Sequence, residues 1–204
     1  MNVPLPAAVL WDMDGTLVNT EPLWQRFSHE IVEEAGGVLT PEDARRIQGA
    51  GIRLHGRILA ASAPQLEAEA AFHAVEDRVC RAHASSIAMP GALDALDLFR
   101  SLSIPQYVIS ASSTKAVSSA MRALGQEHFA GFISDEAGLP SKPAPDPYLE
   151  GARRLGVRIR DCVIFEDSAN GLAAARASGA AVWDVNDTPL TALTLEKVRL
   201  LFAR

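Results

Sequence analysis

Short runs of apolar residues, each ended by a polar or turn residue, recur along this chain. Residues 7–11 read Ala-Ala-Val-Leu-Trp, an unbroken apolar run. Because the run does not alternate between polar and apolar positions, it predicts a strand buried on both faces of a sheet. Similar runs predict four further strands, at residues 106–109, 131–134, 161–165 and 181–185.

Helical patterns separate these strands in the second part of the chain. In residues 92–102, Leu93, Leu96 and Phe99 recur at helical spacing and predict an amphipathic helix. Further helices are predicted at residues 115–124, 148–155, 172–178 and 193–202. Strands that alternate with helices predict an α/β fold, a parallel sheet with helices on both faces.

The stretch between the first two strands has a different pattern, with helical spacing throughout. Leu23, Phe27 and Ile31 mark a helix over residues 21–35, and Thr40-Pro41 is a typical helix start. Helices are also predicted at residues 52–61 and, after Pro64, at residues 65–83. Residues 19–88 are therefore predicted to form an inserted all-helical domain, and residues 1–18 and 89–204 the α/β core.

Charged residues follow the first strand directly, at Asp12 and Asp14. Two carboxylates at the end of a buried strand are costly unless a group such as a divalent cation compensates them. The carboxyl ends of the strands are also where open α/β sheets place their active sites. A polar turn with both acids in solvent is the alternative for an isolated Asp-x-Asp.

Three later strands or loops carry polar groups in the same way. A hydroxyl-rich turn that includes Ser110, Ala111 and Ser112 precedes a helix and could bind phosphate, although an ordinary Ser/Thr helix cap is the better explanation of the turn taken alone. Lys142 stands on a proline-rich loop, where it is either a fixed charge or a solvated surface residue. Glu166 and Asp167 follow the fourth strand, and their side chains should alternate in direction.

Composition narrows the class of protein. The chain has 204 residues, of which 48% are hydrophobic and 22% charged, as in a soluble globular protein. A net charge of -6 argues against non-specific nucleic-acid binding. Cys80 and Cys162 fit neither a disulfide framework nor a metal site, and no signal or membrane span is evident. We therefore expect a cytoplasmic protein with no membrane or nucleic-acid partner.

The five histidines do not have the spacing of metal ligands, so all are expected to be structural or exposed: His29, His55, His73, His83 and His128.

The segment from Asp12 to Val18, Asp-Met-Asp-Gly-Thr-Leu-Val, resembles the first motif of the haloacid dehalogenase superfamily. Ser110, Lys142-Pro143 and the acidic pair 166–167 with its Asp-Ser-x-x-Gly continuation are similar to the second, third and fourth motifs. The four occur in the right order and cover nearly the whole chain. The resemblance is to the branch with sugar-phosphate phosphatases and β-phosphoglucomutases, and it implies a Rossmann-like core with a helical cap.

This resemblance implies roles for the strand-end residues. Asp12 would be the nucleophile that forms an aspartyl-phosphate, and Asp14 the general acid and then base. Ser110 and Lys142 would hold the phosphoryl group. Mg²⁺ would be bound by the metal ligands of the motifs: Asp12, Asp14 through its backbone carbonyl, Asp167 and Glu166. Arg53, Ala111 and Ser112 are further candidates for substrate contact.

The resemblance leaves alternatives open and includes departures. Asn19 stands where many relatives carry Asp, and residues 47–53 match the family's specificity loop only loosely, so Arg53 is equally well a solvated surface residue. We expect a monomeric Mg²⁺-dependent phosphatase acting on a small phosphate ester, such as a sugar phosphate. A β-phosphoglucomutase-type mutase uses the same residues, and a phosphate-sensing protein without catalysis is the third alternative.

Overall fold

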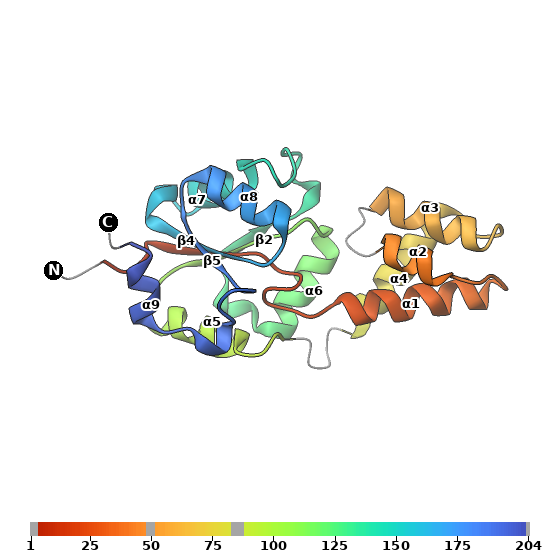
Figure 1. Cartoon of the computed structure of the whole chain (residues 1–204), viewed down its shortest axis with the longest axis horizontal. Helices are drawn as coiled ribbons and strands as arrows, with labels where there is room; N and C mark the ends of the chain where they lie inside the picture. Colours follow the sequence, from red (N-terminus) through yellow and green to blue (C-terminus); the bar gives the residue numbers. More distant parts are fainter. Residues whose placement is uncertain (1–3, 48–51, 83–87, 203–204) are drawn as a thin grey trace. The chain divides into compact units, whose positions relative to one another are not determined.

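A computed structural model describes residues 4–47, 52–82 and 88–202 of the chain. It divides into two compact units, residues 1–19 with 87–204 and residues 20–86. The first unit contains the sheet, and the second is helical throughout the part that the structure describes (Figure 1). None of the helices within the described ranges is long and apolar enough to cross a lipid bilayer.

The sheet of the first unit has five parallel strands in the order β3-β2-β1-β4-β5. Their bounds are Ala8–Trp11 for β1, Gln106–Ile109 for β2, Gly131–Ile133 for β3, Cys162–Glu166 for β4 and Ala181–Asp184 for β5. The chain reaches β2 and β3 on one side of β1, and then β4 and β5 on the other. The strand order therefore reverses between β1 and β4, the position at which open α/β sheets form their ligand-binding crevice.

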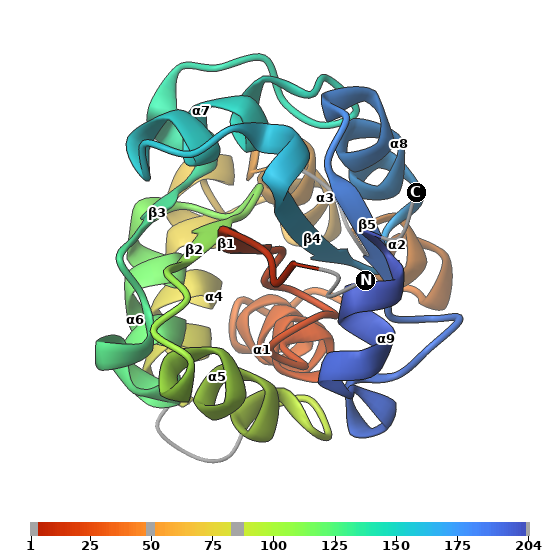
Figure 2. The same cartoon turned by 90° about the vertical axis from the view of Figure 1, so that its left-hand side faces the viewer.

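Helices cover both faces of the sheet, so the predicted α/β fold is confirmed. Helices α7 (Asp146–Arg154) and α8 (Ala169–Ser178) lie on one face, and α5 (Ala92–Ser101), α6 (Thr114–Leu124) and α9 (Leu195–Leu200) on the other (Figures 1 and 2). Short 3₁₀ segments occur at Gln126–His128, Asp135–Ala137, Ile159–Asp161 and Leu190–Ala192.

Strand alternation divides the buried side chains between the two faces. Leu10 and Ile164 belong to the cluster under α7 and α8, together with Tyr148. Trp11 and Phe165 point to the opposite face, where their rings stack at a centroid distance of 4.2 Å. Trp11 is fully buried, in agreement with its predicted role in the core.

Four helices make up the described part of the second unit: α1 (Glu21–Glu34), α2 (Pro41–Ile47), α3 (Ile52–Ser62) and α4 (Ala68–Ala82). Their apolar faces form a separate core. The Thr40 hydroxyl accepts a hydrogen bond from the backbone N–H of Asp43 at 3.1 Å, as the predicted helix start requires. The core of this unit also contains His55, whose ring nitrogen Nε2 lies 2.9 Å from the Ser28 hydroxyl.

The predicted helix bounds were wrong by two residues or more at α7, which begins at Asp146 instead of residue 148, and at α4, α8 and α9. Helix α4 begins at Ala68 instead of residue 65, because the chain after Pro64 first forms a turn in which Leu66 N–H bonds to the Ala63 carbonyl at 2.9 Å. Helix α8 begins three residues earlier than predicted, since the Ser168 side chain caps it. Helix α9 is shorter than residues 193–202 because its cap is Thr194.

Candidate active site

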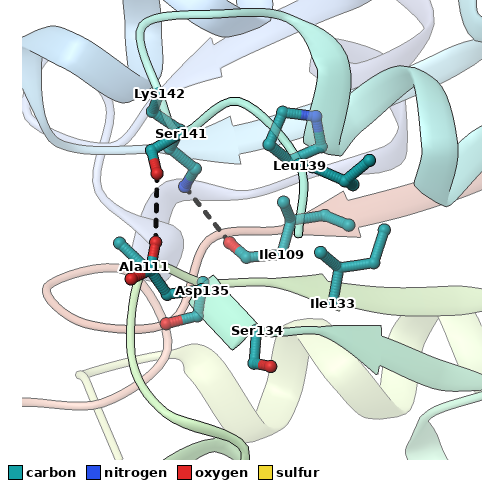
Figure 3. Close-up of a pocket in the computed structure, with 10 residues that line it drawn as sticks. Ile109, Ala111, Ile133, Ser134, Asp135, Leu139, Ser141 and Lys142 are labelled. Carbon is teal, nitrogen blue, oxygen red and sulfur yellow. Dashed lines mark hydrogen bonds between the residues drawn. The ribbon is translucent and has the colours of Figure 1, made fainter. Parts of the chain in front are cut away.

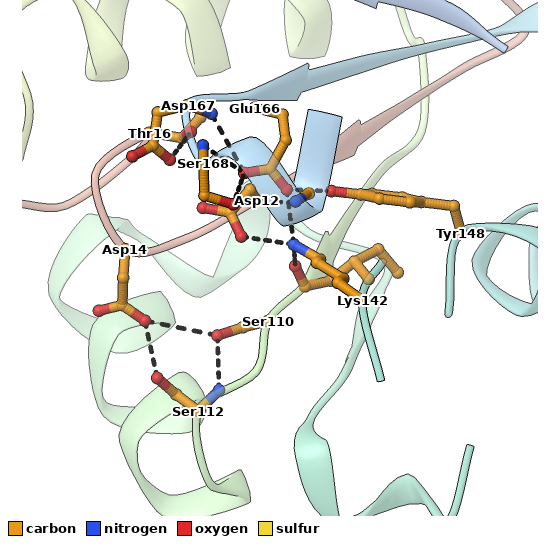
Figure 4. Close-up of polar contacts among 12 residues, drawn as sticks. Asp12, Asp14, Thr16, Ser110, Ser112, Lys142, Tyr148, Glu166, Asp167 and Ser168 are labelled. Atoms are coloured by element: carbon orange, nitrogen blue, oxygen red, sulfur yellow. Dashed lines mark hydrogen bonds and ion pairs between the residues drawn. The ribbon is translucent and has the colours of Figure 1, made fainter. Parts of the chain in front are cut away.

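Polar side chains from the ends of β1, β2 and β4 meet at one edge of the sheet (Figure 4). Asp12 follows β1 and is 7% exposed, Ser110 follows β2, and Glu166 is the last residue of β4. Because β1 lies between β2 and β4, Asp12 stands at the centre of this group. The structure thus brings together residues that the sequence predicts only separately.

Lys142 links these strand ends from the loop that precedes α7. Its Nζ donates hydrogen bonds to Asp12 Oδ1 at 2.6 Å, Glu166 Oε2 at 2.7 Å and the Ile109 carbonyl at 3.1 Å. These three bonds use all the protons of a lysine ammonium. Burial disfavours the charge, but the carboxylates of Asp12 and Glu166 outweigh it and raise the pKa of Lys142. Lys142 is therefore a fixed positive charge and not a solvated surface residue.

Asp12 is the buried acid of this group. Burial raises its pKa well above the ordinary value, the Lys142 ammonium acts in the opposite direction, and the Glu166 carboxylate adds to the rise. Asp12, Glu166 and Asp167 each place a carboxylate oxygen within 4.8 Å of the others, and Lys142 forms ion pairs with the first two. A second cation near Asp12 would therefore favour its ionised form.

The carboxylate of Asp14 is held by the hydroxyl-rich turn after β2. Its Oδ2 accepts hydrogen bonds from Ser112 Oγ at 2.7 Å and from Ser110 Oγ at 3.4 Å. Ser110 Oγ in turn accepts one from the backbone N–H of Ser112 at 3.0 Å. The helix cap of α6 is a different residue, Ser113. Ser110 and Ser112 therefore do not cap α6, and both hydroxyls lie at the site beside Asp14.

Asp167 lies opposite the turn that follows Asp12. Thr16 Oγ1 donates a hydrogen bond to Asp167 Oδ1 at 3.0 Å. Gly15 has a φ of +93°, and a Cβ at this position would overlap the Asp167 carboxylate. Burial raises the pKa of Asp167, while the Thr16 hydroxyl lowers it. Only glycine thus lets the first loop approach Asp167 so closely.

The residues present fit a divalent cation. One carboxylate oxygen from each of Asp12, Glu166 and Asp167 lies within 4.8 Å of the others. Oxygen ligands of this kind suit Mg²⁺, and the acids outnumber the lysine. Glu166 differs from the other two acids in being fully buried, and its Oε2 already accepts a hydrogen bond from Lys142.

A small hollow adjoins the site beside Lys142 (Figure 3). Ser110, Ala111 and Lys142 line it on the side of the site, and Ile133 and Leu139 give it an apolar wall. Ala111, a predicted substrate contact, thus lies at the edge of the site.

Arg53, the other predicted substrate contact, is exposed on α3 in the second unit. The neighbouring segment Gly49-Ala50-Gly51, part of the loose match to the family's specificity loop, lies outside the described residues.

Sequence reasoning missed three residues that shape the site. Thr16 contacts Asp167 as described above, and Tyr148 and Ser168 both contact Glu166. Thr16 lies within the first motif, and its small polar side chain there could have identified it as a site residue. Tyr148 gave no such signal, because an aromatic residue in an amphipathic helix indicates core.

The sequence pattern of the haloacid dehalogenase-like hydrolase family matches residues 6–179. The chain belongs to this family. It is a phosphoric monoester hydrolase of the branch that includes sugar phosphatases and β-phosphoglucomutases.

Three relatives illustrate the similarity. Hexitol phosphatase A of Escherichia coli is 29% identical over 184 residues, which cover 88% of this chain and 84% of that protein. CbbY from Rhodobacter sphaeroides, solved in complex with phosphate, is 26% identical with a TM-score of 0.75, covering 87% of this chain and 85% of that one. The protein SUPPRESSOR OF QUENCHING 1, chloroplastic, of Arabidopsis thaliana is 31% identical over 84% of this chain, which spans only 17% of its length.

Proposed function

We propose that this protein is a Mg²⁺-dependent phosphatase that hydrolyses a small sugar phosphate through an aspartyl-phosphate on Asp12. The observation that carries the proposal is the buried Asp12 carboxylate, 2.6 Å from Lys142 Nζ and beside the Asp167 carboxylate. A carboxylate that is held between a fixed ammonium and a cation-binding group is suited to attack an anionic phosphorus centre.

Each step has a residue to perform it. An oxygen of Asp12 forms a bond to phosphorus as the ester P–O bond breaks, and Asp14 gives its proton to the leaving alkoxide. Water then attacks the aspartyl-phosphate, passes a proton to Asp14, and releases phosphate and the Asp12 carboxylate. Lys142 stabilises the charge on the phosphoryl oxygens during both transfers, and Ser110 donates to the same oxygens.

The metal would be held by the side chains of Asp12 and Asp167 and by the backbone carbonyl of Asp14, with Glu166 beside them. When bound, Mg²⁺ supplies positive charge that reduces the repulsion between the Asp12 carboxylate and the phosphate ester. The carboxylate cluster supports this assignment.

The helical unit, residues 20–86, would act as a cap that excludes water and reads the leaving group. Without such a cap, bulk water would hydrolyse an aspartyl-phosphate on Asp12 without regard to the substrate. The similarity to a hexitol phosphatase supports a polyhydroxylated leaving group.

The decisive experiment is a screen of phosphorylated metabolites with and without Mg²⁺, following free phosphate and isomerised product separately. The panel includes hexose phosphates, hexitol phosphates and a two-carbon acid phosphate. Release of phosphate from a polyol ester that requires both Mg²⁺ and Asp12 supports the proposal. Isomerised product without free phosphate would identify a mutase, and phosphate binding without turnover would identify a sensor.

A further inference from the structure

A tyrosine hydroxyl is buried directly behind the phosphate-binding lysine. Tyr148, on α7, is fully buried, and its hydroxyl donates a 2.6 Å hydrogen bond to Glu166 Oε2. Its ring also lies beneath Lys142, with Nζ 5.0 Å from the ring centroid. The chemistry proposed above gives this hydroxyl no role, yet it contacts the same carboxylate oxygen that holds Lys142 (Figure 4).

Glu166 accepts hydrogen bonds at both of its carboxylate oxygens. Oε2 is shared between Lys142 at 2.7 Å and Tyr148 at 2.6 Å. Oε1 accepts from the backbone N–H groups of Asp167 and Ser168, each at 3.1 Å, and from the Ser168 hydroxyl at 3.0 Å. Five donors leave the carboxylate little remaining capacity for a metal ion.

This carboxylate joins two parts of the site that come from different elements. One end fixes the ammonium of Lys142, and the other fixes the main chain of Asp167 at the start of α8. The fit is close, because a Cβ at Gly171 would overlap the Glu166 carboxylate. A rotation of Glu166 would therefore displace the lysine and the loop of Asp167 together.

We propose that Tyr148 is a positioning residue, whose hydroxyl holds Glu166 as a bridge between Lys142 and the Asp167 loop and away from the metal. This inference rests on the proposed function, in which Lys142 serves the phosphoryl group and Asp12 and Asp167 hold Mg²⁺. Without the hydroxyl, Oε2 has only Lys142 to hold it, and the carboxylate is freer to turn toward a divalent cation.

The test is Tyr148→Phe, which removes the hydroxyl and keeps the ring under Lys142. Turnover should fall about tenfold or more, the usual effect of losing a buried hydrogen bond to a charged group. Most of the loss should be in kcat, because the ammonium matters most when charge accumulates in the transfer. Mg²⁺ binding, measured by calorimetry without substrate, should not weaken, because the Asp12 and Asp167 side chains are unchanged and the released Glu166 carboxylate can only add a ligand.

The matched control is Tyr107→Phe, at the only other tyrosine of the chain. Tyr107 is also buried in the same cluster, and its hydroxyl accepts a 3.4 Å hydrogen bond from Arg154. This control should keep the parent's kcat. A general effect of losing a buried hydroxyl would lower both variants equally and overturn the inference.

Two results for Tyr148→Phe would overturn the proposal: an unchanged kcat, or a Mg²⁺ affinity that falls in parallel with kcat. If the variant does not fold, it is made in the Glu166→Gln background, where the side chain at position 166 carries no charge that would be left without the Tyr148 hydroxyl. There the added Tyr148→Phe change should cost less than about twofold in kcat, and a further tenfold loss would contradict the coupling. A parent protein without phosphatase activity would instead refute the proposed function.

Discussion

The buried histidine of the helical unit makes stability depend on pH in a direction that the structure determines. His55 is 3% exposed and lies against the rings of Trp24 and Phe72. Burial lowers its pKa from 6.5 to about 4. The unfolded chain therefore binds a proton at His55 between these two values, whereas the folded chain does not. The contribution of neutral His55 to the free energy of unfolding is therefore fully present above the pKa of the unfolded chain. It is lost as the pH falls toward the pKa of His55 in the folded chain.

The size of the effect follows from the two pKa values. The full shift corresponds to a loss of about 3 kcal/mol of unfolding free energy. This loss is complete only when the pH lies below both pKa values. Lowering the pH from about 7.5 to about 5 should remove roughly 2 kcal/mol of it, since the unfolded histidine is almost fully protonated at the lower value. This is a large part of the stability of an ordinary domain.

The assay is urea denaturation of the parent and of His55→Gln at both pH values. Gln is polar and does not titrate, so the variant should lack about 2 kcal/mol of the pH dependence, whatever its own stability. Ser28→Ala is the control: it removes the hydrogen-bond partner of His55 and keeps the titrating ring, so the fall with pH should persist. Equal pH dependence in the parent and in His55→Gln would refute the reasoning.

Three further predictions concern the candidate site and the cap. Asp12→Asn should lower turnover by at least ~10³-fold with the fold intact by circular dichroism, because an amide is a poor nucleophile; turnover within tenfold of the parent would place the nucleophile elsewhere. A chelator should stop activity until Mg²⁺ is added, and Asp167→Ala should raise the Mg²⁺ concentration needed for half-maximal rate; indifference to chelation would contradict the metal assignment. Arg53→Ala should change the ranking of substrates and leave turnover of a small generic phosphomonoester nearly unaffected, with Arg57→Ala, at an exposed position on the same helix, as control. An equal loss of turnover on every substrate would place Arg53 in the chemistry or the fold, and no change would leave it a surface residue.

Much of the fold was predictable because the apolar pattern of each strand is local. The strand at residues 106–109 was predicted with its observed bounds. Helix starts were predicted less well, since a capping side chain such as Ser168 or Thr194 decides the first residue more than the apolar period does. The hydrogen bond between Tyr148 and Glu166 joins α7 to β4, and no periodicity in either element indicates such a pair.

Strand alternation, which continues to Asp12 directly after β1 and to Glu166 at the end of β4, explains why these particular acids meet Lys142. Leu10 and Ile164 point toward α7 and α8, so Asp12 and Glu166, two residues further along each chain segment, continue on the same face. The sheet pairing extends this far, because Asp12 N–H bonds to the Phe165 carbonyl at 2.9 Å. Tyr148 belongs to the cluster on that face, and Lys142 precedes α7, the helix that covers it. Asp167 follows the strand end and escapes this alternation, which leaves it half-buried beside Thr16, in the position where the proposed function needs a metal ligand.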